Sequence, residues 1–170
     1  MTRILVLNGP NLGSLGHREP EIYGGRSLAE IESTLRARAA ELEVELRFEQ
    51  RNGEGELIDV LEEESGRSAA LVINPGALSH TSVALLDALR AFPGPVIEVH
   101  LSNTFAREAY RRVMLTAEAA DSVIVGLGAD GYTVGLEAAL RAASGETRVG
   151  RDDNRGRRWS WRRMPGRSRR

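Results

Sequence analysis

Cysteine and lysine are both absent from the 170 residues of the chain. Without cysteine there is no disulfide, no thiolate nucleophile and no cysteine-based metal site. Without lysine, the permanently basic side chains are all arginine, which stays protonated and cannot form the imine of a Schiff-base enzyme. The same absence excludes a P-loop, because that phosphate-binding motif ends in Gly-Lys-Ser/Thr.

Long apolar runs are also missing. No stretch approaches the roughly 18 consecutive apolar residues of a membrane helix, and the start Met-Thr-Arg leads directly into a strand-like pattern without a signal peptide. We therefore expect a cytoplasmic protein that does not contact a membrane. Three histidines are present, and no carboxylates stand near them at the spacing of metal ligands. The sequence thus indicates no metal site.

The overall net charge of −1 hides a division of charge along the chain. Residues 1–145 hold 13 Arg against 21 Asp and Glu, whereas residues 146–170 hold 10 Arg against 3 acids. The second segment has few aliphatic residues and no periodic pattern of apolar residues. We therefore expect one domain, large enough to be catalytic, over 1–145 and a disordered, Arg-rich tail over 146–170. Such blocks of like charge are usually solvated, and a nucleic-acid partner, which would have to bind this tail, is not expected.

Short apolar runs rich in β-branched residues alternate with helical patterns. The runs, which read as buried strands, are 4–7, 44–48, 70–73, 96–99 and 122–125. Helices are expected from a capping box at Ser27 and Glu30, around 57–61, from Val83 to the stop at Pro93, after the fourth strand, and over 132–143. The pattern predicts an α/β fold: a single-domain, flavodoxin-like, doubly wound sandwich with a five-stranded parallel sheet.

Polar residues follow three of these strands. They are Asn8, Asn11, Arg18 and Tyr23 after the first, Asn74 and His80 after the third, and His100, Ser102 and Asn103 after the fourth. Ligands of such folds bind at the carboxyl ends of the strands, so these side chains should converge at one edge of the sheet.

Arg18 and Tyr23 occupy one glycine-rich loop. The unperturbed pKa of tyrosine is about 10, too high for a good base at neutral pH, but a nearby arginine favours the phenolate. Tyr23 is therefore a candidate general base, with Arg18 as its activator. An alternative is that Arg18 pairs with Glu19 or Glu21 at the surface.

Glu98 and His100 point the same way from the end of the fourth strand, because residues two apart on a strand share a face. A carboxylate beside an imidazole fixes its tautomer and makes His100 a candidate general acid oriented by Glu98. The other interpretation is a hydrogen-bonded histidine that ends a strand, and His80 has the same two interpretations.

Two asparagines could hold an oxygen or a water with their amides, as an oxyanion site does. These are Asn11 and Asn74, although either could serve its own turn, and for Asn8 the turn role is favoured. Arg107 and Arg111 stand four apart on the helix expected after the fourth strand, where one could bind a carboxylate through two hydrogen bonds.

Together these blocks resemble the type II 3-dehydroquinate dehydratases, the class that needs no lysine. The similarity covers about residues 3–143 and rests on five ordered motifs: NGPNL with GxREPxxYG at 8–24, EGELID at 54–59, INPGALSHTS at 73–82 followed by Asp87, PVIEVHLSN with ARE at 95–108, and GLGADGY at 126–132.

The resemblance implies loss of water from 3-dehydroquinate by anti elimination through an enolate, without a cofactor. Tyr23 would take the proton with Arg18 lowering its pKa, Asn11 would position a water at the enolate oxygen, and His100, aided by Glu98, would protonate the leaving hydroxyl. The residues implied to bind substrate are Asn74, His80, Ser102, Arg111 and the backbone of Leu101, with Asp87 presented from a neighbouring subunit of a homododecamer (a tetramer of trimers).

A few positions depart from the family pattern near Arg111. Phe105 replaces a frequent histidine, and Val113-Met114 replaces a usually polar pair. These departures leave open a catalytically weakened, flavodoxin-like binding module of the same family.

Overall fold

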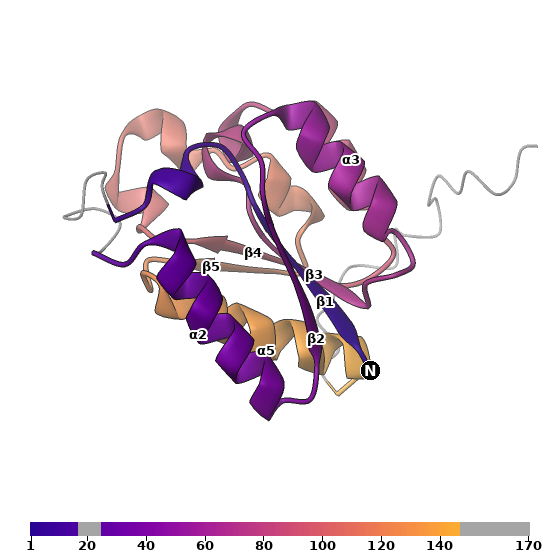
Figure 1. The fold of residues 1–170 in the computed structure, drawn as a ribbon. Coiled ribbons are helices and arrows are strands. Elements are labelled where there is room, and N and C mark those ends of the chain that lie inside the picture. Colours follow the sequence, from indigo (N-terminus) through magenta and orange to yellow (C-terminus); the bar gives the residue numbers. More distant parts are fainter. Residues whose placement is uncertain (17–24, 147–170) are drawn as a thin grey trace, which may run out of the picture.

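A computed structural model describes residues 1–16 and 25–146 of the chain. They form a five-stranded parallel sheet with the strand order β2-β1-β3-β4-β5 (Figure 1). The strands are β1 (Arg3–Asn8), β2 (Glu45–Gln50), β3 (Ala70–Asn74), β4 (Val96–His100) and β5 (Ser122–Val125). The predicted single-domain, flavodoxin-like fold is confirmed. The order reverses between β1 and β3, and at such a switch point the flanking loops diverge and leave a crevice at the carboxyl edge.

Helices cover both faces of the sheet. In Figure 1, α2 (Leu28–Glu41) and α5 (Asp130–Ser144) lie on one side of the strands, and α3 (Glu54–Glu64) lies on the other, which it shares with α4 (Val83–Ala91). The apolar run of β1 serves both faces: Ile4 belongs to the core under α2 and α5, and Leu5 to the core under α3 and α4. A strand buried on both sides needs such a continuous apolar sequence.

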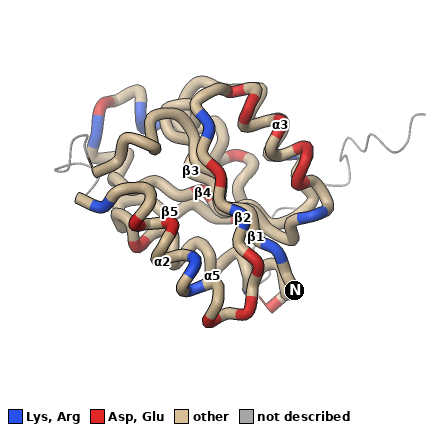
Figure 2. The backbone as a smooth tube through the Cα atoms, in the orientation of Figure 1, with Lys and Arg blue, Asp and Glu red and all other residues tan. Residues whose placement is uncertain are grey.

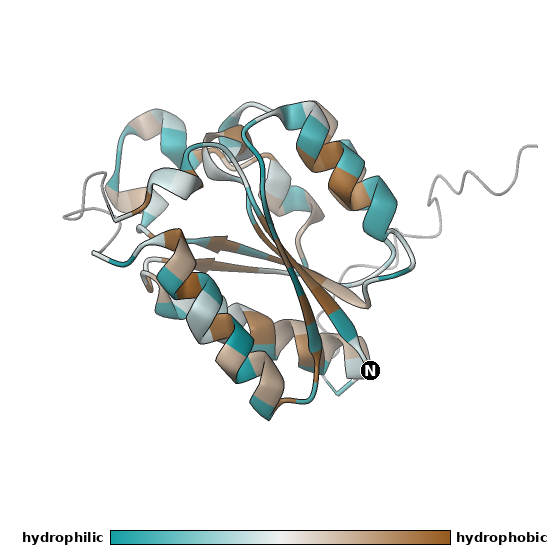
Figure 3. Ribbon diagram, in the orientation of Figure 1, coloured by the Kyte–Doolittle hydropathy of each residue, from teal (hydrophilic) through white to brown (hydrophobic). Residues whose placement is uncertain are grey.

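Charge and hydropathy on α3 follow the same division. Figure 2 shows acidic residues along this helix, and Figure 3 shows apolar residues interspersed with hydrophilic ones. Leu57 and Leu61 are buried against the sheet, whereas Glu62 and Glu63 are exposed. The helix is thus held by burial of one face.

The capping box predicted for α2 is present. The Ser27 hydroxyl oxygen accepts a hydrogen bond from the Glu30 backbone N–H at 3.2 Å, and the Glu30 carboxylate accepts one from the Ser27 N–H at 2.7 Å. These two bonds satisfy donors that the first helical turn leaves unpaired. The pKa of the Glu30 carboxyl is lowered by the bond from the Ser27 N–H and by a further bond from the Ser27 hydroxyl at 2.8 Å, because both favour the charged carboxylate.

The prediction of a helix after β4 is wrong. Residues 101–121 instead contain three short 3-10 helices: η3 (Thr104–Ala106), η4 (Ala109–Arg112) and η5 (Thr116–Ala119). The backbone of this segment bonds to its surroundings, with the Leu115 N–H donating to Ser79 O at 2.7 Å and the Asp121 N–H to Val96 O at 2.7 Å. These two bonds attach the later part of the segment to the connection that follows β3 and to the start of β4.

The chain leaves the sandwich at the end of α5. Gly145 terminates that helix in a left-handed conformation, with φ of 79°. Residues 147–170, which make up nearly all of the predicted Arg-rich tail, lie outside the described residues. Among the helices of the described part, none is long and apolar enough to cross a membrane.

Candidate active site

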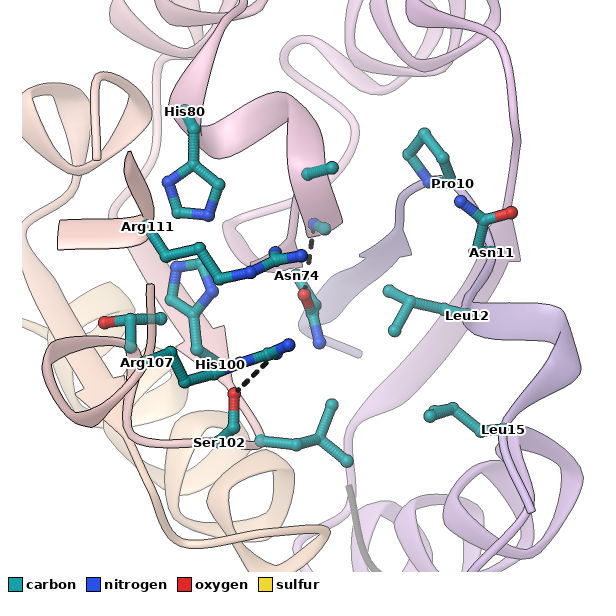
Figure 4. A pocket seen from close by; sticks show the side chains of 14 residues that line it. Pro10, Asn11, Leu12, Leu15, Asn74, His80, His100, Ser102, Arg107 and Arg111 are labelled. Carbon is teal, nitrogen blue, oxygen red and sulfur yellow. Dashed lines mark hydrogen bonds between the residues drawn. The ribbon is translucent and has the colours of Figure 1, made fainter. Parts of the chain in front are cut away.

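A pocket lies beyond the carboxyl ends of β1, β3 and β4, at the edge where the sequence places its polar loops (Figure 4). The lining residues are Pro10, Asn11, Leu12, Leu15, Asn74, Gly76, Ala77, His80, His100, Leu101, Ser102, Thr104, Arg107 and Arg111. Seven of the predicted site residues are among them: Asn11, Asn74, His80, His100, Leu101, Ser102 and Arg111. Loops far apart in the sequence therefore meet at one place.

A buried carboxylate holds the His100 imidazole. His100 Nε2 lies 2.7 Å from Glu98 Oε1, and the Ser79 hydroxyl donates to the same oxygen at 3.2 Å. Glu98 and Ser79 are fully buried, and His100 is 6% exposed where it lines the pocket. Because an ionised carboxylate only accepts, Nε2 carries the hydrogen of this bond, and Nδ1 remains for a ligand. Ser79 is a contact that the sequence pattern did not single out.

His80 is oriented by a backbone carbonyl. Its Nδ1 lies 2.7 Å from Val113 O, which has no hydrogen to give, so Nδ1 is the donor. Nε2 is then the ring nitrogen left for a ligand in the pocket. The contact also ties the segment after η4 to the end of η2 (Gly76–His80).

Asn74 belongs to a buried network of side chains. Its Nδ2 donates to the Tyr132 hydroxyl at 3.0 Å, and that hydroxyl donates to Asn8 Oδ1 at 2.6 Å. Asn8 Nδ2 donates in turn to Glu49 O at 3.1 Å, and the Gly76 N–H donates to Asn74 Oδ1 at 3.2 Å. Asn74 thus serves a turn and lines the pocket. The turn role favoured for Asn8 is wrong, because its side chain bridges β2 and α5.

Two arginines reach the pocket from the segment after β4. Figure 4 shows the side chains of Arg107 and Arg111 extending toward Asn74, with the Arg107 guanidinium donating to Ser102 Oγ at 3.5 Å. Arg111 Nε donates to the Glu108 carboxylate at 3.0 Å. The pKa of the Glu108 carboxyl is lowered, mainly by a hydrogen bond from the Glu108 backbone N–H and also by the charges of Arg107 and Arg111. Because the guanidinium groups of Arg107 and Arg111 line it, the pocket can receive an anion such as a carboxylate.

Asn11 stands at the mouth of the pocket in a left-handed conformation, with φ of 66°. Asparagine tolerates this region better than most residues. The Asn11 backbone N–H donates to Asn52 Oδ1 at 3.1 Å, which fixes the loop after β1. The Asn11 side chain lines the pocket and is exposed.

Four of the predicted site residues do not line this pocket: Glu98, which is buried behind His100, and three that the described residues do not place there. Asp87 lies on α4 with 67% of its side chain exposed, 3.7 Å from Arg90, and does not line the pocket. Arg18 and Tyr23 lie outside the described residues. Over 1–16 and 25–146, no group of three His, Asp or Glu is arranged to hold a metal ion.

Residues 2–140 match the family model described as dehydroquinase class II. The chain belongs to the class II dehydroquinases. A 3-dehydroquinate dehydratase from Chelativorans sp. is 56% identical over 136 residues, which cover 79% of this chain and 94% of the relative. The 3-dehydroquinate dehydratase of Bacillus subtilis is 46% identical over 148 residues, covering 87% of this chain and all of the relative.

Solved structures agree with this dehydroquinase assignment. The crystal structure of a type II dehydroquinase from Butyrivibrio crossotus superposes with a TM-score of 0.80 at 36% identity, covering 82% of this chain and 97% of that one. A type II dehydroquinase from Propionibacterium acnes gives a TM-score of 0.78 at 37% identity, covering 85% and 97% of the two chains. The resemblance read from the sequence motifs is confirmed, and nothing in these comparisons supports a non-catalytic binding module.

Proposed function

We propose that this dehydroquinase is a hydro-lyase that converts 3-dehydroquinate to 3-dehydroshikimate in the shikimate pathway, which leads to chorismate and the aromatic amino acids. The observation that carries the proposal is the Glu98–His100 pair in a pocket that also holds two guanidinium groups. A proton donor beside an anion site suits a substrate that carries a carboxylate and loses a hydroxyl. The names of the relatives point to the same reaction.

The reaction we propose is an anti elimination in two steps. The Tyr23 phenolate, favoured by Arg18, takes the proton alpha to the ketone, and the electrons of the broken C–H bond form an enolate. Asn11 positions a water that stabilises the enolate oxygen. The enolate then re-forms the ketone as the C–O bond breaks, and His100 gives its proton to the departing hydroxyl, which leaves as water. Transfer of the Tyr23 proton to solvent and reprotonation of His100 complete the cycle.

Substrate positioning falls to the other polar groups of the pocket. Asn74 and His80 would hold substrate hydroxyls, and the Leu101 backbone with Ser102 and Arg111 would hold the carboxylate. All five line the pocket, which supports these roles. The arginines are suited to a carboxylate because a guanidinium can donate two parallel hydrogen bonds.

The proposed assembly is a cytoplasmic homododecamer built as a tetramer of trimers, in which Asp87 approaches the pocket of a neighbour. The exposure of Asp87, and the fact that it does not line the pocket of its own chain, support that role. Phe105, Tyr110 and Val113 are large and exposed around the pocket segment, as residues at a subunit contact often are. Light scattering of the purified protein tests this proposal, and a monomer at micromolar concentration would contradict it.

The decisive experiment is a dehydration assay without added metal or cofactor. Enone ultraviolet absorbance should appear when the protein meets 3-dehydroquinate, with or without a chelator. Tyr23→Phe should remove nearly all turnover and leave the fold intact, whereas the matched variant Tyr110→Phe should keep it. No absorbance at high protein concentration would contradict the proposed reaction, and near-normal turnover by Tyr23→Phe would dismiss Tyr23 as the base.

A further inference from the structure

Tyr132 is a fully buried tyrosine whose hydroxyl contacts two asparagines of the sheet. It lies in the first turn of α5, is 1% exposed and does not line the pocket. Asn8 and Asn74 are register partners at the ends of β1 and β3. The Tyr132 hydroxyl therefore joins a helix to the switch point of the sheet, directly behind a residue that lines the pocket.

The hydrogen bonds of this network have one allowed direction. The Glu49 carbonyl only accepts, so Asn8 turns its Nδ2 toward β2 and its Oδ1 toward Tyr132. The Tyr132 hydroxyl must then give its single hydrogen to Asn8 Oδ1, at 2.6 Å. With that hydrogen used, the hydroxyl can only accept from Asn74, which presents Nδ2 at 3.0 Å.

A second constraint on Asn74 agrees with the first. The Gly76 N–H can only donate, and it lies 3.2 Å from Asn74 Oδ1. The Gly76 N–H, which donates to Oδ1, and the Tyr132 hydroxyl, which accepts from Nδ2, therefore select the same orientation of the Asn74 carboxamide. After these bonds, Asn74 keeps one N–H and one oxygen lone pair for a ligand.

We propose that Tyr132 is a positioning residue that fixes which end of the Asn74 carboxamide faces the substrate. The two ends of an amide have nearly the same shape and opposite hydrogen-bonding character, so a rotated amide would offer an acceptor where the substrate needs a donor. This inference rests on the proposed function, in which Asn74 binds a substrate hydroxyl. Tyr132 itself touches neither the pocket nor the reacting atoms.

The test is a KM-against-kcat comparison of Tyr132→Phe with the wild-type chain. Losing one oriented hydrogen bond should raise KM about threefold to tenfold with kcat within about twofold. Leu89→Ala, on the buried face of α4, is the control, because it lowers stability without touching the network and should leave KM unchanged. Asn8→Leu keeps both Tyr132 and Asn74 but releases the tyrosine hydrogen, and it should also raise KM.

A double-mutant cycle distinguishes positioning from general damage. If Tyr132 acts through Asn74, then Tyr132→Phe should have no further effect on KM when Asn74→Ala is already present. Additive effects, or an unchanged KM in both Tyr132→Phe and Asn8→Leu, would overturn the inference while leaving the proposed function intact. If the wild-type chain gives no turnover, the proposed function fails separately. In that case, solvent exchange of the Asn74 carboxamide hydrogens tests whether Tyr132 holds this side chain. Tyr132→Phe and Asn8→Leu must both reduce the protection of these hydrogens, and unchanged protection would overturn the inference.

Discussion

The two carboxylate oxygens of Glu98 differ in their hydrogen-bond partners. Oε1 accepts from both His100 and Ser79, whereas Oε2 is buried without a hydrogen-bond partner among the described residues. Burying a charge is costly unless it is compensated. Among the described residues, the hydrogen bonds from His100 and Ser79 are therefore the compensation that this carboxylate receives.

Replacing this charge should slow the reaction while keeping the shape of the site. Glu98→Gln still offers an oxygen to His100 but no negative charge, so we expect kcat to fall by about 10²-fold. Ser79→Ala leaves the charge in place and should cost only about threefold. Initial rates from enone absorbance measure both, with thermal unfolding as the control for the fold. A Glu98→Gln variant with a near-normal rate would contradict the role of the pair.

The residue scale is also where sequence reasoning succeeds and fails most clearly. The spacing of Glu98 and His100 identified their contact, because two residues on one strand share a face. The contact between Asn8 and Tyr132 joins positions 124 apart, and no local pattern reports such a pair. Asp87 shows a different limit, because its expected partner would belong to another subunit.

Among the elements, the loops at the sheet edge depend on close backbone approach. A Cβ added at Gly9 would lie 2.5 Å from Pro75 O, between the loops that follow β1 and β3. The Gly9 N–H also donates to Asn74 O at 2.8 Å. Any side chain at position 9 would force these two loops apart at the pocket.

Gly9→Ala should therefore lower both stability and activity. We expect a loss of about 1–3 kcal/mol in the free energy of unfolding, as for other overpacked positions. Gly55→Ala is the matched control: it lies in α3 with nothing within 4 Å of the added Cβ, and it should stabilise the chain by up to about 1 kcal/mol. Urea unfolding and the dehydration assay measure both variants. Equal effects of the two substitutions would contradict the packing argument.

The capping box of α2 gives a prediction in acid. Ser27→Ala removes an N-cap and should cost about 1 kcal/mol. The lowered pKa of Glu30 means that its contribution is present above the unfolded value of about 4.3 and is lost as pH falls through the folded value. Glu30→Gln should therefore make stability less dependent on pH in this range. Urea midpoints at pH 7 and pH 3 test this, and identical pH dependence in both chains would refute it.

Elements with regular periodicity were predictable, and the irregular connection was not. The capping box at Ser27 predicted the start of α2, and Pro93, which predicted the end of α4, stands two residues after its last residue, Ala91. The segment carrying Arg107 and Arg111 has the right spacing for a helix but winds into 3-10 turns. Further along the segment, Leu115 and Asp121 bond to Ser79 and Val96, which belong to other elements, and such long-range contacts leave no periodic signal in the sequence.

At the scale of the whole molecule, we propose that the basic tail is separate from the catalytic domain. Deleting residues 147–170 removes 10 Arg and 2 Asp and changes the formal net charge from −1 to −9. The pocket uses residues 10–111, so kcat and KM should stay within about twofold, and the urea midpoint should not move. Charge should affect colloidal behaviour instead, with later elution from an anion exchanger. A large loss of activity in the truncated chain would show that the tail contributes to the site.

The orientation of His80 has a consequence for inhibitor design. Because Nδ1 is committed to the Val113 carbonyl, the neutral imidazole can offer only a lone pair to a bound molecule. A compound that directs a hydroxyl or an amine toward Nε2 should gain affinity, and its ether or fluoro analogue should lose it. A single backbone contact, from His80 to Val113 O, thereby sets which polar groups an inhibitor can usefully place at this position.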